Sequence, residues 1–195
     1  MRTLVAKFRK ARASARAGAA NEGGLAAVEF ALLLPVMLTL FFGVVEVSLA
    51  LACRADVTAV SYTAADLIAQ ESTIAPADIS NVWSAISAIL YPYSTTAAQI
   101  TLTSVNYDTV GKSLTSGKVA WSCTKGGTAR TVGQSVTLPT GLMTTNGSVI
   151  MSEITYAYTS PTTRIITGPL SMQNTFYTKP RRVAQIGAPS SCPSS

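Results

Sequence analysis

The sequence contains no histidine and few charged residues. Its 195 residues include 15 Lys or Arg and 9 Asp or Glu, so 12% are charged and 48% are hydrophobic. Without histidine, the chain lacks the usual general base of Ser-His-Asp and Cys-His enzymes and the commonest ligand of zinc. In typical soluble domains, about a quarter of all residues are charged. The composition therefore argues against a histidine-dependent enzyme and against an ordinary cytosolic globule.

Cysteine is also scarce, and the three cysteines are widely separated. Cys53, Cys123 and Cys192 do not form the C-x-x-C pairs that are typical of zinc sites. No catalytic constellation is visible elsewhere in the chain. We therefore expect no metal, no cofactor, no small-molecule substrate and no enzymatic activity.

The positive charge is concentrated at the N-terminus. Six of the 15 basic residues but only one of the nine acidic residues precede Gly24, so this segment carries +5 of the formal charge of +6. The remaining residues, 25–195, are nearly neutral. A basic chain would by itself raise nucleic-acid binding as a prospect. Because a short leader accounts for the charge, we expect no nucleic-acid partner.

A long apolar run follows this basic leader. Residues 30–53 contain a single carboxylate, that of Glu46. At about 1.5 Å per residue they extend over roughly 36 Å as a helix, enough to cross a hydrocarbon core of about 30 Å. A buried helix of a soluble protein would be shorter and have a polar face. Since basic flanks stay on the cytoplasmic side, we predict a single-pass inner-membrane protein with a cytoplasmic N-terminus and a periplasmic C-terminal part.

The rest of the chain changes from helical to strand-forming patterns. Apolar residues at three- and four-residue steps extend the first helix over residues 25–70, and a second amphipathic helix is predicted from Pro76 to Leu90. Beyond residue 97, β-branched runs alternate with turn residues. The five runs are 99–107, 118–123, 131–138, 148–159 and 174–178. We therefore predict an α+β fold in which residues 71–195 form a periplasmic domain of one helix and an antiparallel sheet.

The junction between leader and apolar run carries a motif. Gly24 is followed by four residues and then by Glu29 and Phe30, directly before the apolar helix. This arrangement resembles a class III prepilin cleavage site. The run A-A-V-E-F-A-L-L-L-P-V, with F-G-V-V-E after it, is similar to TadE-like pseudopilins of tight-adherence (Flp) type IV pilus systems. The segment F-Y-T-K-P-R at 176–181 also fits that family.

The resemblance has consequences for processing and partners. It implies that a prepilin peptidase cuts between Gly24 and Leu25, so that residues 1–24 are a removable leader. It also implies that Glu29 and Phe30 guide docking beside other pilins and the Tad pilus machinery. Glu29 would pair with the new amine of Leu25 or with that of a neighbouring subunit. Because major Flp pilins are much shorter, the family resemblance implies a minor pseudopilin or assembly factor with a structural role in pilus biogenesis and adhesion.

The surroundings of Glu46 and the pairing of two cysteines are further points on which the sequence bears. Glu46 is either hydrated near the outer membrane surface or in contact with a basic group of a partner transmembrane helix, and the sequence leaves both open. Cys123 and Cys192 fall in the predicted periplasmic part, where disulfides persist. On these compartment grounds we favour a disulfide between them over two free thiols.

Two alternatives to the pseudopilin interpretation remain. The first is an uncleaved single-pass protein whose periplasmic domain binds a partner in an envelope complex. The second is a secreted or lipid-anchored adhesin cut near Ala52. The first residue of the mature protein distinguishes the three: Leu25 for the pseudopilin, Met1 for the uncleaved protein and Cys53 for the adhesin.

Overall fold

The computed structural model describes residues 22–193, which are divided between two compact units. The first unit is Met1–Val45 and the second is Glu46–Ser195. The predicted leader lies outside the described residues up to residue 21.

The longest element is α2 (Glu22–Ala69), a helix of 48 residues whose exposure changes along its length. Residues 24–42 are exposed on every side of the helix. From residue 46 onward, a buried stripe recurs at steps of four and three residues. Its members are Glu46, Ala50, Cys53, Val57, Val60 and Ala64. A helix that is apolar all round suits lipid, whereas a buried stripe of this spacing is typical of packing against a domain.

The second unit also contains a short helix and a five-stranded antiparallel sheet. These elements are α3 (Pro76–Leu90), the 3-10 turn η1 (Thr95–Ala97), β1 (Ala98–Tyr107), β2 (Ser116–Lys125), β3 (Ser135–Thr137), β4 (Ser148–Tyr158) and β5 (Leu170–Thr178). The strand order is β3-β2-β1-β4-β5, so β1 is central and β5 is an edge strand. Ala98 pairs with Tyr156 and Asn106 with Ser148. The β1–β2 loop and the β4–β5 loop therefore lie at opposite ends of the sheet.

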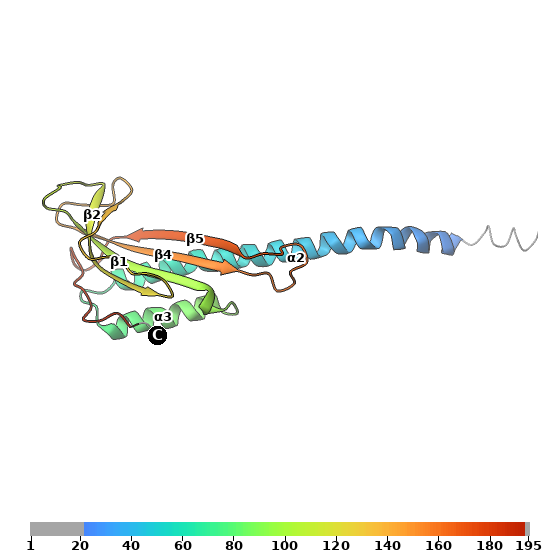
Figure 1. The fold of residues 1–195 in the computed structure, drawn as a ribbon, viewed down its shortest axis with the longest axis horizontal. Coiled ribbons are helices and arrows are strands. Elements are labelled where there is room, and N and C mark those ends of the chain that lie inside the picture. Colours follow the sequence, from blue (N-terminus) through green and yellow to red (C-terminus); the bar gives the residue numbers. More distant parts are fainter. Residues whose placement is uncertain (1–21, 194–195) are drawn as a thin grey trace, which may run out of the picture. The chain divides into compact units, whose positions relative to one another are not determined.

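The helices of the second unit cover one face of this sheet (Figure 1). Val57 of α2 and Trp83 of α3 share one core with Ile100 and Ile154 of the central strands. A second, smaller cluster forms around Val119 and includes residues from the segment between β3 and β4. At the start of α3, the Asp78 carboxylate accepts a hydrogen bond from the Ala75 N–H at 2.8 Å, which satisfies a free donor of the first turn.

The predicted α+β fold is confirmed, with a long helix, a short helix and an antiparallel sheet. Strand β3 has only three residues instead of the predicted 131–138, because Gly133 adopts a φ of +81° and residues 131–134 form a turn. The compact second unit begins at Glu46 and therefore includes the C-terminal half of α2. Ala50 and Cys53 are part of its core, so the part of α2 whose apolar residues are exposed on every side ends before Glu46.

Candidate functional site

The residues of the predicted cleavage and docking motif, Gly24 to Phe30, lie in the first three turns of α2. The side chains of Leu25 and Phe30 are 64% and 58% exposed, and Glu29 is exposed as well. A Cβ at Gly24 would meet nothing within 4 Å. Within the described residues, the two ion pairs join Arg130 to Glu153 and Arg181 to Asp66, so neither involves Glu29. A carboxylate on an apolar helix needs such a partner when it enters lipid.

Helix α2 is the candidate membrane span. Within residues 22–193 it is the one helix that is long and apolar enough to cross a bilayer. The described part of α2 that belongs to the first unit and has assigned exposure, residues 24–45, extends over about 33 Å, which matches a hydrocarbon core of about 30 Å. Its apolar residues are exposed all round, so lipid is the environment that would bury them. These features support a single-pass membrane protein.

Glu46, the residue directly after this segment, has a carboxylate that the chain itself satisfies. Its side chain is fully buried. The backbone N–H groups of Arg164, Ile165 and Ile166 donate to it at 2.7, 3.0 and 2.6 Å. The hydroxyl of Thr162 donates to it as well. All four donors belong to the 159–169 loop, which joins β4 to β5, so Glu46 fastens this loop to α2.

The backbone of the 159–169 loop is bent to make these contacts. Thr163 has a φ of +48°, in the left-handed region that β-branched residues rarely adopt. Conformations of this kind let successive N–H groups converge on one anion. Such strain costs about 1–3 kcal/mol and persists only where other contacts hold it. The carboxylate of Glu46 supplies those contacts.

This arrangement differs from both sequence expectations for Glu46, namely a hydrated residue or a contact to a partner helix. A signal for its burial was present in the sequence: Glu46, Ala50, Cys53 and Val57 continue the three- and four-residue spacing of the buried stripe. The 159–169 loop was not predicted as the partner of Glu46. Backbone N–H groups have no residue signature, and no pattern links this loop to a residue more than a hundred positions away.

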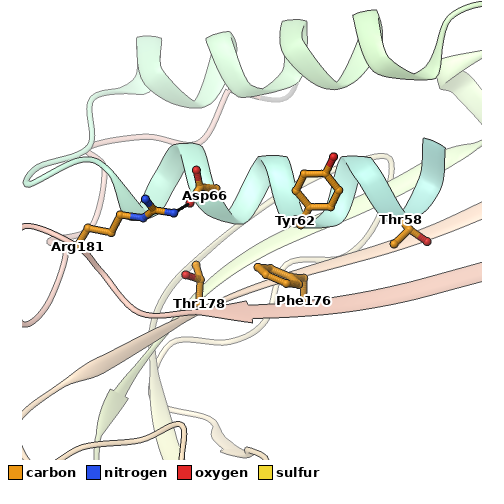
Figure 2. Close-up of a pocket in the computed structure, with 6 residues that line it drawn as sticks. All are labelled: Thr58, Tyr62, Asp66, Phe176, Thr178 and Arg181. Carbon is orange, nitrogen blue, oxygen red and sulfur yellow. Dashed lines mark hydrogen bonds and ion pairs between the residues drawn. The ribbon is translucent and has the colours of Figure 1, made fainter. Parts of the chain in front are cut away.

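An open groove of about 450 Å³ lies between α2 and the edge strand β5 (Figure 2). The rings of Tyr62 and Phe176 meet edge to face, with centroids 6.4 Å apart. Next to them, Asp66 and Arg181 form an ion pair, and the Arg181 N–H donates to the carbonyl of Ala69 at 2.8 Å. The groove is lined by Thr58, Tyr62, Asp66, Phe176, Thr178 and Arg181. It thus places the F-Y-T-K-P-R segment, residues 176–181, beside the C-terminal half of α2.

The C-terminal tail is attached to the sheet by a disulfide. Cys123 of β2 and Cys192 form the bridge that sequence analysis favoured, with Cα atoms 5.3 Å apart. Two indole N–H groups hold the tail on either side, because Trp121 donates to the carbonyl of Ile186 and Trp83 to that of Pro193, both at 3.1 Å. Cys53 is a free thiol buried in the core.

Burial also affects the hydroxyl groups of two tyrosines in the second unit. It raises the pKa of Tyr93 and of Tyr158, and the two rings meet edge to face at 6.1 Å. The Tyr93 hydroxyl donates to the carbonyl of Leu49 in α2 at 3.2 Å. Because both phenols stay protonated, they serve as hydrogen-bonding and packing groups. In the described part of the chain, no cluster of His, Cys, Asp or Glu is arranged to hold a metal ion.

Comparison with known proteins agrees with the motif at the start of α2. Residues 24–66 match the model of a family described as TadE-like protein. No curated protein and no solved structure matches the chain. The matched stretch contains both Glu29 and Glu46 and ends at Asp66 in the groove. A TadE-like segment suggests involvement in Tad pilus systems. The predicted resemblance is confirmed: residues 24–66 are similar to the corresponding segment of TadE-like proteins.

Proposed function

We propose that this protein is a minor pseudopilin or assembly factor of a Tad/Flp type IV pilus. The observation that carries the proposal is that the TadE-like match covers the helical segment whose apolar side chains are exposed on every side. Such a segment is buried by lipid and by the helices of neighbouring subunits. The protein acts structurally, with its N-terminus in the cytoplasm and its second unit in the periplasm, anchored in the inner membrane.

The leader, residues 1–24, is removed by a prepilin peptidase at the bond between Gly24 and Leu25. The bond lies in the first turn of α2, where helices fray, and among the described residues nothing lies within 4 Å of a Cβ built on Gly24. Cleavage creates an amine at Leu25, four residues before Glu29 and therefore one helical turn away. That amine, in the same or a neighbouring subunit, is the cation that the exposed carboxylate of Glu29 requires.

Glu29 and Phe30 act in docking, whereas Glu46 acts indirectly. Glu29 and the exposed ring of Phe30 are available to neighbouring subunits in the Tad machinery. The carboxylate of Glu46 is enclosed by four donors of its own chain. Its contribution to assembly is to keep the 159–169 loop in place.

The test of this proposal is the N-terminus of the mature protein. The full chain is produced together with the Tad machinery and its peptidase, and its mass and N-terminal sequence are determined. We expect a mature protein that begins at Leu25, and a Gly24→Val variant that stays at full length. Gly43→Val is the matched control, because a Cβ at either glycine meets nothing within 4 Å.

Each other outcome rejects the proposal in a recognisable way. A mature protein that begins at Met1 fits the uncleaved membrane protein, and one that begins at Cys53 fits the lipid-anchored adhesin. A cut before Cys53 would also remove Glu46 and divide a continuous helix. A Gly24→Val variant with the same mass as the processed wild type would show that processing does not require this site.

A further inference from the structure

We propose that the 159–169 loop is a lipid-contacting element that rests on the membrane surface where the chain leaves the bilayer. Arg164 binds the phosphate of anionic lipids, and Ile165 enters the boundary between headgroups and acyl chains. The inference depends on insertion of α2 into a membrane and is independent of the pilus assignment.

Chain connectivity places the loop at this level. The apolar segment 24–45 matches the thickness of a hydrocarbon core, so it ends near Val45. Glu46 is the next residue, and the N–H groups of Arg164, Ile165 and Ile166 lie 2.6–3.0 Å from its carboxylate. The loop is therefore held within one side-chain length of the residue that follows the apolar segment.

The exposed side chains of the loop suit a membrane interface. Ile165 is 48% exposed and Leu170, directly after the loop, is 40% exposed. Arg164 is exposed as well, and the sequence 159–169 contains no acidic residue. Exposed apolar groups next to a cation are the combination that binds an anionic bilayer surface. The long arginine stem can lie along apolar groups while the guanidinium reaches phosphate.

The contacts to Glu46 also remove the main obstacle to placing a loop at a membrane. Backbone N–H groups are costly near lipid unless they are hydrogen-bonded. Here three consecutive N–H groups of the loop are satisfied by a carboxylate of the same chain. The loop can therefore approach the acyl boundary without leaving these donors unpaired.

The β1–β2 loop provides a matched control. It lies at the opposite end of the sheet, as the register of β1 and β4 shows. Its Val110 is 90% exposed, and Lys112 lies two residues further on. Like the 159–169 loop, it presents a β-branched side chain and a cation, but it has no link to Glu46. A general affinity of exposed apolar residues for lipid would affect Val110 as well, because it is the more exposed of the two residues.

The test measures the depth of a nitroxide label on the full chain in vesicles of phosphatidylethanolamine and phosphatidylglycerol. In a Cys53→Ala background with the disulfide intact, single cysteines replace Leu38, Val110 or Ile165. Collision with oxygen, which concentrates in lipid, is compared with collision with a water-soluble nickel chelate. We expect Leu38→Cys to report the acyl region, Val110→Cys to report water and Ile165→Cys to report the headgroup level.

The outcomes distinguish a failure of the loop proposal from a failure of α2 to insert into the membrane. If Leu38→Cys is in lipid while Ile165→Cys is as accessible to nickel as Val110→Cys, the loop proposal is overturned and the pilus assignment is untouched. If Leu38→Cys reports water, α2 does not insert and the proposal loses its premise. The proposal is supported if the label at position 165 reports a depth between water and the acyl region while the label at position 110 reports water.

A second measurement tests the role of the arginine. Only the backbone of Arg164 contacts Glu46, so Arg164→Gln leaves the fastening intact. We expect the oxygen-to-nickel ratio at position 165 to fall about twofold or more with Arg164→Gln, and also when phosphatidylcholine replaces the anionic lipid. Lys112→Gln should leave that ratio unchanged. A ratio at 165 that responds to neither change would overturn the assignment of Arg164 to lipid phosphate.

Discussion

The two halves of α2 contain one unusual glutamate each, and their surroundings are opposite. Glu29 is exposed among apolar side chains, with no ion-pair partner in the described part of the chain. Glu46 is fully buried and accepts four hydrogen bonds from the 159–169 loop. The same residue type in one helix therefore has two different uses. Glu29 has no ion-pair partner among residues 22–193, whereas the donors to Glu46 are part of the fold.

The apolar residues of the two halves differ in the same way. Leu32 is 73% exposed, whereas Val57 is 1% exposed, although both lie on the same helix and both are aliphatic. Hydrophobicity alone therefore does not show where a membrane segment ends. The change from exposure on all sides to a buried stripe at three- and four-residue steps shows that the fully exposed apolar segment ends near Val45.

The largest expected effect is the loss of the Glu46 carboxylate. Glu46→Ala leaves three backbone N–H groups without an acceptor, so we expect the Tm of the second unit to fall by roughly 10–20 °C. Glu29→Ala should change this Tm by less than about 1 °C, because its side chain supports no fold contact among the described residues. Tryptophan fluorescence in detergent micelles measures the transition, since Trp83 and Trp121 both lie in the second unit's core.

A graded substitution sharpens this test. Glu46→Gln keeps one acceptor oxygen but turns an amide donor toward the N–H groups, so its Tm should lie between wild type and Glu46→Ala. Equal Tm values for the Glu46→Ala and Glu29→Ala variants would remove the distinction between the two halves of the helix.

The next effect in size concerns the disulfide, which constrains only the second unit. Its two cysteines are 69 positions apart, and removing a bridge over such a loop costs about 2–5 kcal/mol. Cys192→Ser should therefore lower the Tm by roughly 5–15 °C. Reductant should have the same effect on the wild type and none on the variant. If reductant leaves the wild-type Tm unchanged, the bridge does not contribute to stability.

Much of this architecture could be predicted from local sequence patterns. The exposed apolar helix, α3 after Pro76 and the strands around Val119 and Ile154 all follow from spacing and residue type. The motif that resembles a prepilin cleavage site could be recognised because Gly24 and Glu29 are close in the sequence. The fastening of Glu46 could not be predicted, because its donors are backbone groups from a distant loop. The groove depends on sheet order, which places β5 at the edge beside Tyr62.

The smallest expected effect tests whether Glu46 holds the loop in its strained form. Thr163 has a φ of +48°, which asparagine tolerates better than a β-branched residue. Thr163→Asn should therefore raise the Tm by about 1–3 °C while the carboxylate is present. In a Glu46→Ala background the loop is free to leave this conformation, so the gain should disappear. A double-mutant cycle of the two substitutions measures this coupling. If the gain is the same in both backgrounds, residues other than Glu46 impose the strain, and the carboxylate binds a loop that is already formed.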